Sequence, residues 1–139
     1  PADYGIESAF NAQIVNSTFA EEHPTAVEDF LRASFAAYAW INESDENLDA
    51  ALAYAESLSE AGYDLDLSAQ RWKTEVGLVE ESQPEGTVLG YQAVDQWTPE
   101  ADMLMENDLI SAEPDIESEI DTSFVEAIYD DGELVWPAP

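Results

Sequence analysis

Apolar residues of this chain recur mostly at the three- and four-residue spacing of amphipathic helices, most clearly over residues 24–42. Pro24 suits the first position of a helix, and Thr25 and Glu28 have the spacing of a capping box. We expect this helix to end near Asn42. Its expected buried face consists of Val27, Phe30, Leu31, Ser34, Ala37, Tyr38 and Ile41.

Two further helices are predicted next. Ser44 is a suitable N-cap for a helix over residues 45–61, which Gly62 would end. Ser68 is the expected cap of a third helix after the "DLDL" segment, and "QPEG" at 83–86 breaks the chain. The expected buried faces are Leu48, Leu52, Ala55 and Leu58 in the first, and Leu65, Trp72, Val76 and Val79 in the second.

The C-terminal third predicts shorter helices. Thr98 and Pro99 indicate a helix start, since the residue before a proline avoids the α region, and the helix would stop at Asn107. The "EPDIESEI" segment is expected to be a polar connector, and the last residues a tail in which Trp136 packs back on the body. A last short helix would be capped by Asp121 or Thr122 and would carry Phe124, Val125 and Ile128.

Residues 9–18, "AFNAQIVNST", have the pattern of a strand. A single strand leaves its backbone groups unpaired, so it would pair either with a second copy of the chain or with a sheet from preceding chain. The expected fold class is therefore mostly α, with about five helices plus one N-terminal strand, in a single domain over residues 1–139.

The net charge of the chain limits which partners and which environment are plausible. The chain has 32 Asp and Glu against 3 Lys and Arg, and its net charge is -29. A nucleic-acid partner is excluded, because phosphate binding needs clustered cations. Acidic residues spread over the whole chain favour a halophilic source, where molar salt screens the repulsion.

Candidate catalytic chemistry is sparse. With no Cys and one His, His23, we expect no transition-metal site, no cofactor and no enzymatic activity. Trp72, like Trp40, is expected in the core, whereas Trp97 at a helix junction could pack or contact a ligand. The two arginines, Arg32 and Arg71, are expected to form ion pairs rather than to meet an anionic ligand.

The segment "HPTAVEDFLRASFAAYAW" resembles the "P-x-x-V-x-x-F-L-x-A" helix near the end of solute-binding proteins of ABC importers. The group includes the nitrate, sulfonate, taurine and thiamine-precursor (hydroxymethylpyrimidine) binding proteins. "VDQWTPEADMLMENDLI" is similar to a later family segment, with Asn107 where glycine is usual, and "IDTSFVEAIYD" is similar to the closing helix. The resemblance covers residues 4–129.

This resemblance implies a parent fold of the two-lobed α/β type of periplasmic binding proteins. The chain would be the C-terminal portion of lobe one, with a hinge-crossing segment near residues 4–18. It implies capture of a small polar solute, for which Tyr4 and Asn11 are the candidate ligand contacts and Glu7 a weaker one. A membrane permease would be the partner, and the protein would be extracellular and membrane-anchored, with signal and anchor in a preceding part of the chain.

Two alternatives stay open. One is a self-standing acidic helical interaction domain, dimeric through the strand at 9–18. The other is an enzyme of the same fold, since thiamine-pyrimidine synthases share it; such an enzyme would need a His-rich or Cys-rich site, which this segment lacks.

Overall fold

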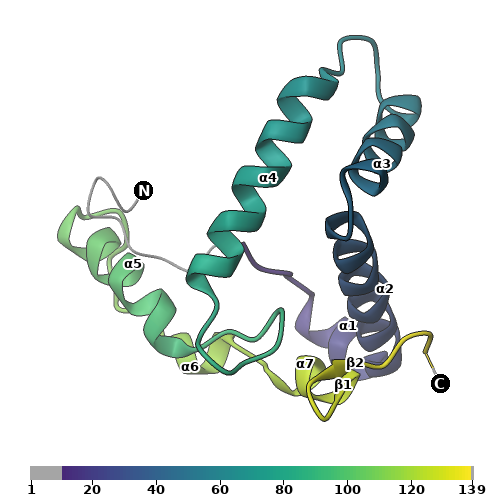
Figure 1. The fold of residues 1–139 in the computed structure, drawn as a ribbon. Helices are drawn as coiled ribbons and strands as arrows, with labels where there is room; N and C mark the ends of the chain where they lie inside the picture. Colours follow the sequence, from purple (N-terminus) through teal and green to yellow (C-terminus); the bar gives the residue numbers. More distant parts are fainter. Residues whose placement is uncertain (1–10, 139) are drawn as a thin grey trace.

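The computed structural model describes residues 11–138, and Tyr4, Glu7 and the rest of residues 1–10 lie outside the described part. The chain is mostly helical and ends in a short two-stranded hairpin (Figure 1). The elements in chain order are α1 (Ser17–Glu22), α2 (Pro24–Asn42), α3 (Asp45–Leu58), α4 (Leu65–Ser82), α5 (Val94–Glu106), α6 (Ile116–Glu119), α7 (Ser123–Ile128), β1 (Tyr129–Asp130) and β2 (Glu133–Leu134).

The main hydrophobic core forms where α1, α2 and α7 meet. Its most buried side chain is Ile128, which is 0% exposed. Phe35 and Leu134 pack on it, and the Tyr129 hydroxyl donates to the Leu89 carbonyl at 3.0 Å, which ties the loop before α5 to the core. The buried members are Ala20, Val27, Leu31, Val125 and Ile128.

The C-terminal hairpin was not expected from the sequence. Its turn consists of Asp131 (φ 49°) and Gly132 (φ 81°), and the backbone N–H of Val135 donates to the Ile128 carbonyl at 2.9 Å. Two consecutive residues with positive φ define the turn that matches strand twist, and Asp-Gly is a favoured pair for it. Trp136 is 54% exposed, so the prediction that it packs back on the body was wrong.

The predicted strand at 9–18 is not a strand in the described part. Residues 11–16 have no regular structure, and residues from Ser17 onward are helical. The Asn16 side chain accepts from the Phe19 N–H at 3.1 Å, so Asn16 is a helix N-cap. Asn11 has a φ of 68°, which is outside the extended region. Dimerisation through this segment loses its structural basis.

The predicted helix starts were right for α2 and α3 and wrong for α4. Ser44 caps α3, with its hydroxyl accepting from the Asn47 N–H at 3.2 Å. The cap of α4 is Asp64, whose carboxylate accepts from the Leu67 N–H at 2.9 Å, and Ser68 lies inside the helix. Both residue types are good caps, so sequence alone did not choose between them.

Two details of the α2 prediction also change. The N-cap of α2 is His23 with no side-chain hydrogen bond, and Glu28 pairs with Arg32 instead of closing a capping box with Thr25. Phe30, assigned to the buried face, is 59% exposed.

Helix α5 runs through Pro99 without a break, although the sequence predicted a start there. The Thr98 hydroxyl donates to the Val94 carbonyl at 3.2 Å, and the Gln96 side chain accepts from the Ala93 N–H at 2.6 Å. These side-chain bonds stabilise the turn that the missing proline N–H weakens. The left-handed residue after the helix is Asp108 (φ 55°) rather than Asn107.

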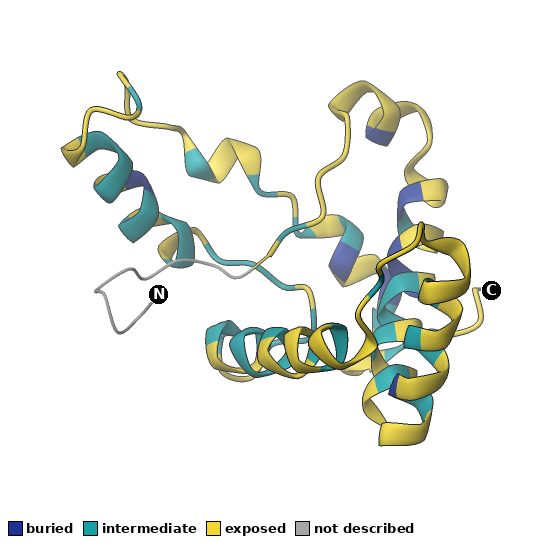
Figure 2. Cartoon of the chain, turned by 90° about the horizontal axis from the view of Figure 1, so that it is seen from above, coloured by how far each residue is buried: buried dark blue, intermediate teal, exposed yellow. Residues whose placement is uncertain are grey.

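Few side chains of the described residues are fully buried (Figure 2). Helix α4 has no buried residue, and α3 has only Leu48. The accessible surface is 10040 Å². A compact chain of 15.3 kDa exposes about 7,100 Å². None of the helices in the described range is long and apolar enough to span a membrane.

Candidate functional site

The predicted ligand contacts are only partly visible. Tyr4 lies outside the described residues, as does Glu7. Asn11 is exposed, its side chain accepts from the Ala12 N–H at 2.9 Å, and its carbonyl accepts from the Gln92 side chain at 3.0 Å. The solute-binding role of Asn11 stays a prediction.

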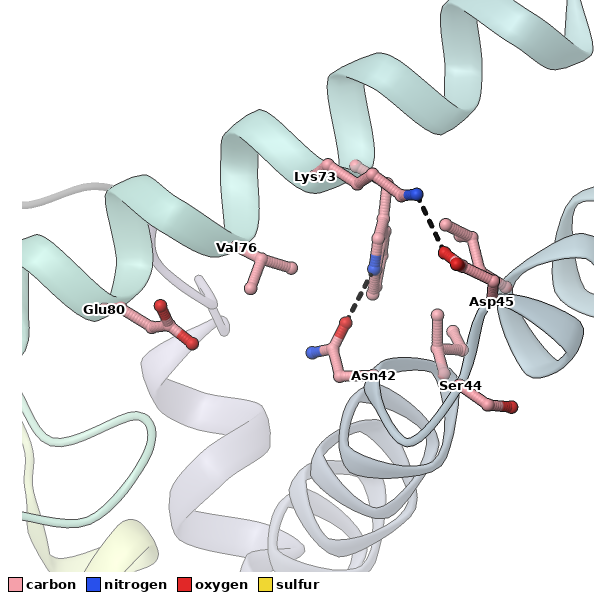
Figure 3. Close-up of a pocket in the computed structure, with 9 residues that line it drawn as sticks. Asn42, Ser44, Asp45, Lys73, Val76 and Glu80 are labelled. Atoms are coloured by element: carbon pink, nitrogen blue, oxygen red, sulfur yellow. Dashed lines mark hydrogen bonds and ion pairs between the residues drawn. The ribbon is translucent and has the colours of Figure 1, made fainter.

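A cleft of about 360 Å³ opens where the C-terminus of α2, the N-terminus of α3 and the middle of α4 meet (Figure 3). We call it the junction cleft. Its apolar wall is made of Ile41, Leu48 and Val76, and Trp72 also lines the cleft. The rim consists of Asn42, Ser44, Asp45, Lys73 and Glu80.

Trp72 fixes the orientation of Asn42. The indole N–H donates to the Asn42 side-chain oxygen at 2.8 Å, so the amide NH₂ points away from the indole (Figure 3). The Tyr38 ring packs on the Trp72 ring with centroids 5.5 Å apart. The pKa of the Tyr38 hydroxyl is raised, mainly by burial, lowered somewhat by its hydrogen bond with Asn42, and raised further by the charge of Glu80.

One ion pair closes the other end of the cleft. Lys73 Nζ lies 2.8 Å from Asp45 Oδ1, and both side chains are mostly exposed. The hydrogen bond and charge of Lys73 lower the pKa of Asp45, and those of Asp45 raise the pKa of Lys73. Such an exposed pair contributes little to stability, so a ligand could replace either partner at small cost.

Arg32 has a structural environment rather than a ligand-binding one. It is 5% exposed and bonds Glu28 at 3.2 Å and Asp29 at 3.0 Å, which confirms the expectation of an ion pair. It also donates to the Ala127 carbonyl at 3.3 Å, which joins α2 to α7. Arg71 is exposed and forms no ion pair with the described residues.

The outer surface of α2 is the second candidate region. An exposed apolar stripe follows it at alternating four- and three-residue spacing, on the face opposite the core. Its large members, Phe30 and Trp40, are 59% and 45% exposed, so the prediction of a core position for Trp40 was wrong. The stripe consists of Ala26, Phe30, Ala33, Ala37 and Trp40.

Other candidate groups have simple surroundings. His23 packs its ring against Phe19, with centroids 5.0 Å apart, at the break between α1 and α2. The indole N–H of Trp97 is buried without a hydrogen-bond partner among the described residues. No three His, Cys, Asp or Glu side chains in residues 11–138 are grouped as a metal site would require.

Comparison of the chain with protein-family models, with curated protein sequences and with solved structures found no match.

Proposed function

We propose that this chain is the C-terminal part of the solute-binding component of an ABC importer. The whole protein would capture a small polar solute between two lobes that close by a hinge motion, and would deliver it to a membrane permease. The solute would be a thiamine precursor, a sulfonate or a similar anion, and the protein would lie outside the cell, anchored to the membrane. Tyr4 and Asn11 would be among the solute contacts.

The observation that carries the proposal is the surface of α2. Residues 30–42 contain no Asp or Glu, although the chain has 32 of them in 139 residues. Over this stretch the helix is apolar on its outer face as well as its inner one. A helix that is apolar all round is normally buried. This supports a role for α2 as an internal helix of a larger fold, as the resemblance implies.

The order of elements also agrees with the resemblance. The long helix from Pro24, the capped helix from Asp45, the helix containing Trp97 and the closing helix at Ser123 are all helices in the structure. The surface of 10040 Å² exceeds the compact value, which supports an association with further polypeptide. A sheet from the rest of lobe one would cover it.

The proposal is tested on the gene and on its whole product. We expect the sequence upstream of the Pro1 codon to encode a signal peptide and alternating strands and helices. Calorimetry of the whole product in molar KCl, with hydroxymethylpyrimidine, taurine and nitrate as probes, should show micromolar binding of one of them. The 139-residue chain, which lacks half the pocket under this proposal, serves as the control and should bind none tightly. A start codon directly upstream of Pro1, or micromolar binding by the 139-residue chain, would overturn the proposal.

The second candidate is a self-standing acidic interaction domain, because the exposed stripe on α2 would equally suit a protein partner. It predicts that the chain is complete by itself and associates through Phe30 and Trp40. Light scattering of the purified chain, with Phe30→Glu for comparison, separates the two: stripe-dependent association of a complete chain favours this candidate.

A further inference from the structure

We propose that the junction cleft binds small organic ammonium cations that carry an apolar body, with the ammonium group at the Glu80 end. This inference does not depend on the solute-binding proposal, because it rests on the cleft's described lining residues, all of which lie between Ile41 and Glu80.

The cleft has an aromatic end and a carboxylate end on one helix face. Trp72, Val76 and Glu80 are four residues apart along α4, so they lie on the same side, over a length of about 12 Å. Figure 3 shows Val76 and Glu80 directed toward the α2 end, where Asn42 stands. An alkyl chain of four or five carbons can therefore lie on Val76 while its charged end reaches Glu80.

Glu80 is the cleft's available carboxylate. It forms no ion pair with the described residues, whereas the cleft's other carboxylate, Asp45, is already paired with Lys73. The Glu80 carboxylate is directed toward Asn42, which accepts from the Trp72 indole N–H (Figure 3). This carboxylate attracts an ammonium group by charge, and Val76 beside it packs against the apolar body of the ligand.

The charge at the cleft selects the sign of the ligand. In molar salt the field of the other acidic residues decays within about 3 Å, so Glu80 itself favours a cation over an anion. One available carboxylate is too few for a divalent metal, which prefers six or more oxygen ligands. An apolar wall of Ile41, Leu48 and Val76 adds affinity only for a cation with an apolar body.

The test uses n-butylammonium chloride as the probe and n-butanol as its neutral counterpart. Binding to the 139-residue chain in molar KCl is followed through the NMR signal of the Trp72 indole N–H. A dissociation constant on the order of 1 mM is expected for n-butylammonium, and at least tenfold weaker binding for n-butanol.

Glu80→Gln removes the carboxylate, and Glu81→Gln is the matched control with the same charge change one residue further along α4, outside the cleft. We expect Glu80→Gln to weaken n-butylammonium about tenfold and Glu81→Gln to leave it unchanged. Circular dichroism of both variants verifies that they fold as the parent chain does. Equal binding of butanol and butylammonium would overturn the proposal, because the cleft would then be only an apolar surface. Equal effects of the two variants would also overturn it, because the acidic surface would then attract the cation without a specific contribution from Glu80. If Glu80→Gln alters the fold, Glu80→Ala replaces it, and unchanged binding by a folded Glu80→Ala variant overturns the proposal.

Discussion

Two regions of this protein are held together in different ways. One region is the core end, which consists of α1, the first half of α2, α7 and the hairpin. It buries apolar side chains that come from opposite ends of the sequence. Arg32 also donates to the Ala127 carbonyl, 95 residues away. In the arm, which we define as α3, α4 and their connecting turn, only Leu48 is buried. The Trp72–Asn42 bond joins the arm to α2, and the exposed Lys73–Asp45 pair joins α4 to α3 within the arm. Burial stabilises the first region, and local helix signals with a few polar contacts stabilise the second.

The largest expected effect comes from salt. The net charge is -29, and the repulsion between the acidic side chains extends over about 10 Å at 0.1 M salt. At 1 M salt it extends over only about 3 Å. We expect helicity by circular dichroism to rise from 0.1 M to molar KCl. Hydrogen exchange should show α3 and α4 losing protection before α2 and α7 as salt is lowered. The prediction is contradicted if helicity is already complete at 0.1 M KCl and does not change up to molar KCl.

Ile128→Ala should then give the largest effect of a single substitution, because the side chain is 0% exposed in the core. We expect a loss of about 3 kcal/mol in the free energy of unfolding, measured by urea denaturation in molar KCl. Leu58→Ala in the arm is the control: its side chain is 71% exposed, so the change should stay within about 0.5 kcal/mol. Similar losses at both positions would remove the contrast between the regions.

Arg32→Met removes the charge that joins α2 to α7 and keeps a similar side-chain length. The Glu28 and Asp29 carboxylates are partly exposed and can be hydrated after the change, so we expect a loss of about 2 kcal/mol. Arg71→Met in the arm should change the free energy of unfolding by less than about 0.5 kcal/mol. A neutral Arg32→Met would mean that core packing alone holds α7 in place.

In the arm, where few side chains are buried, the N-cap of α4 is the better position at which to test stability. Asp64→Ala should cost about 1 kcal/mol, because it removes the acceptor of the Leu67 N–H, and should raise hydrogen exchange in the first turn of α4. Ser68→Ala should cost less, since Ser68 lies inside the helix. A larger effect at Ser68 would restore the start of α4 that the sequence suggested.

The smallest expected effect is the titration of Asp45. Lys73 lowers its pKa, so the pair contributes stability above the ordinary carboxyl pKa and loses it as pH falls through the lowered value. The exposed setting keeps this contribution small. NMR titration of the Asp45 carboxyl should give a midpoint below that of an unpaired aspartate, and Lys73→Met should return it to the ordinary range. An unchanged midpoint in the variant would show that the pair does not form.

The elements predicted correctly are those with a local signal. Pro24 and the spacing of Val27 and Leu31 determine α2, and Ser44 determines the start of α3. The Asp131-Gly132 turn has a local signal too, because Asp-Gly is a favoured hairpin pair, although we expected a tail at this place. The junction cleft was not predictable, since it depends on α4 meeting the end of α2 thirty positions earlier in the chain.

The sequence by itself determined that the chain is helical, strongly acidic and without thiol chemistry, because periodicity, charge and composition act locally or sum over the whole chain. The tertiary structure decided which apolar residues are covered. Phe30 and Leu31 are neighbours of similar hydrophobicity, yet Leu31 faces α7 and is 7% exposed while Phe30 is 59% exposed. Burial depends on where a second element packs, which no local pattern specifies.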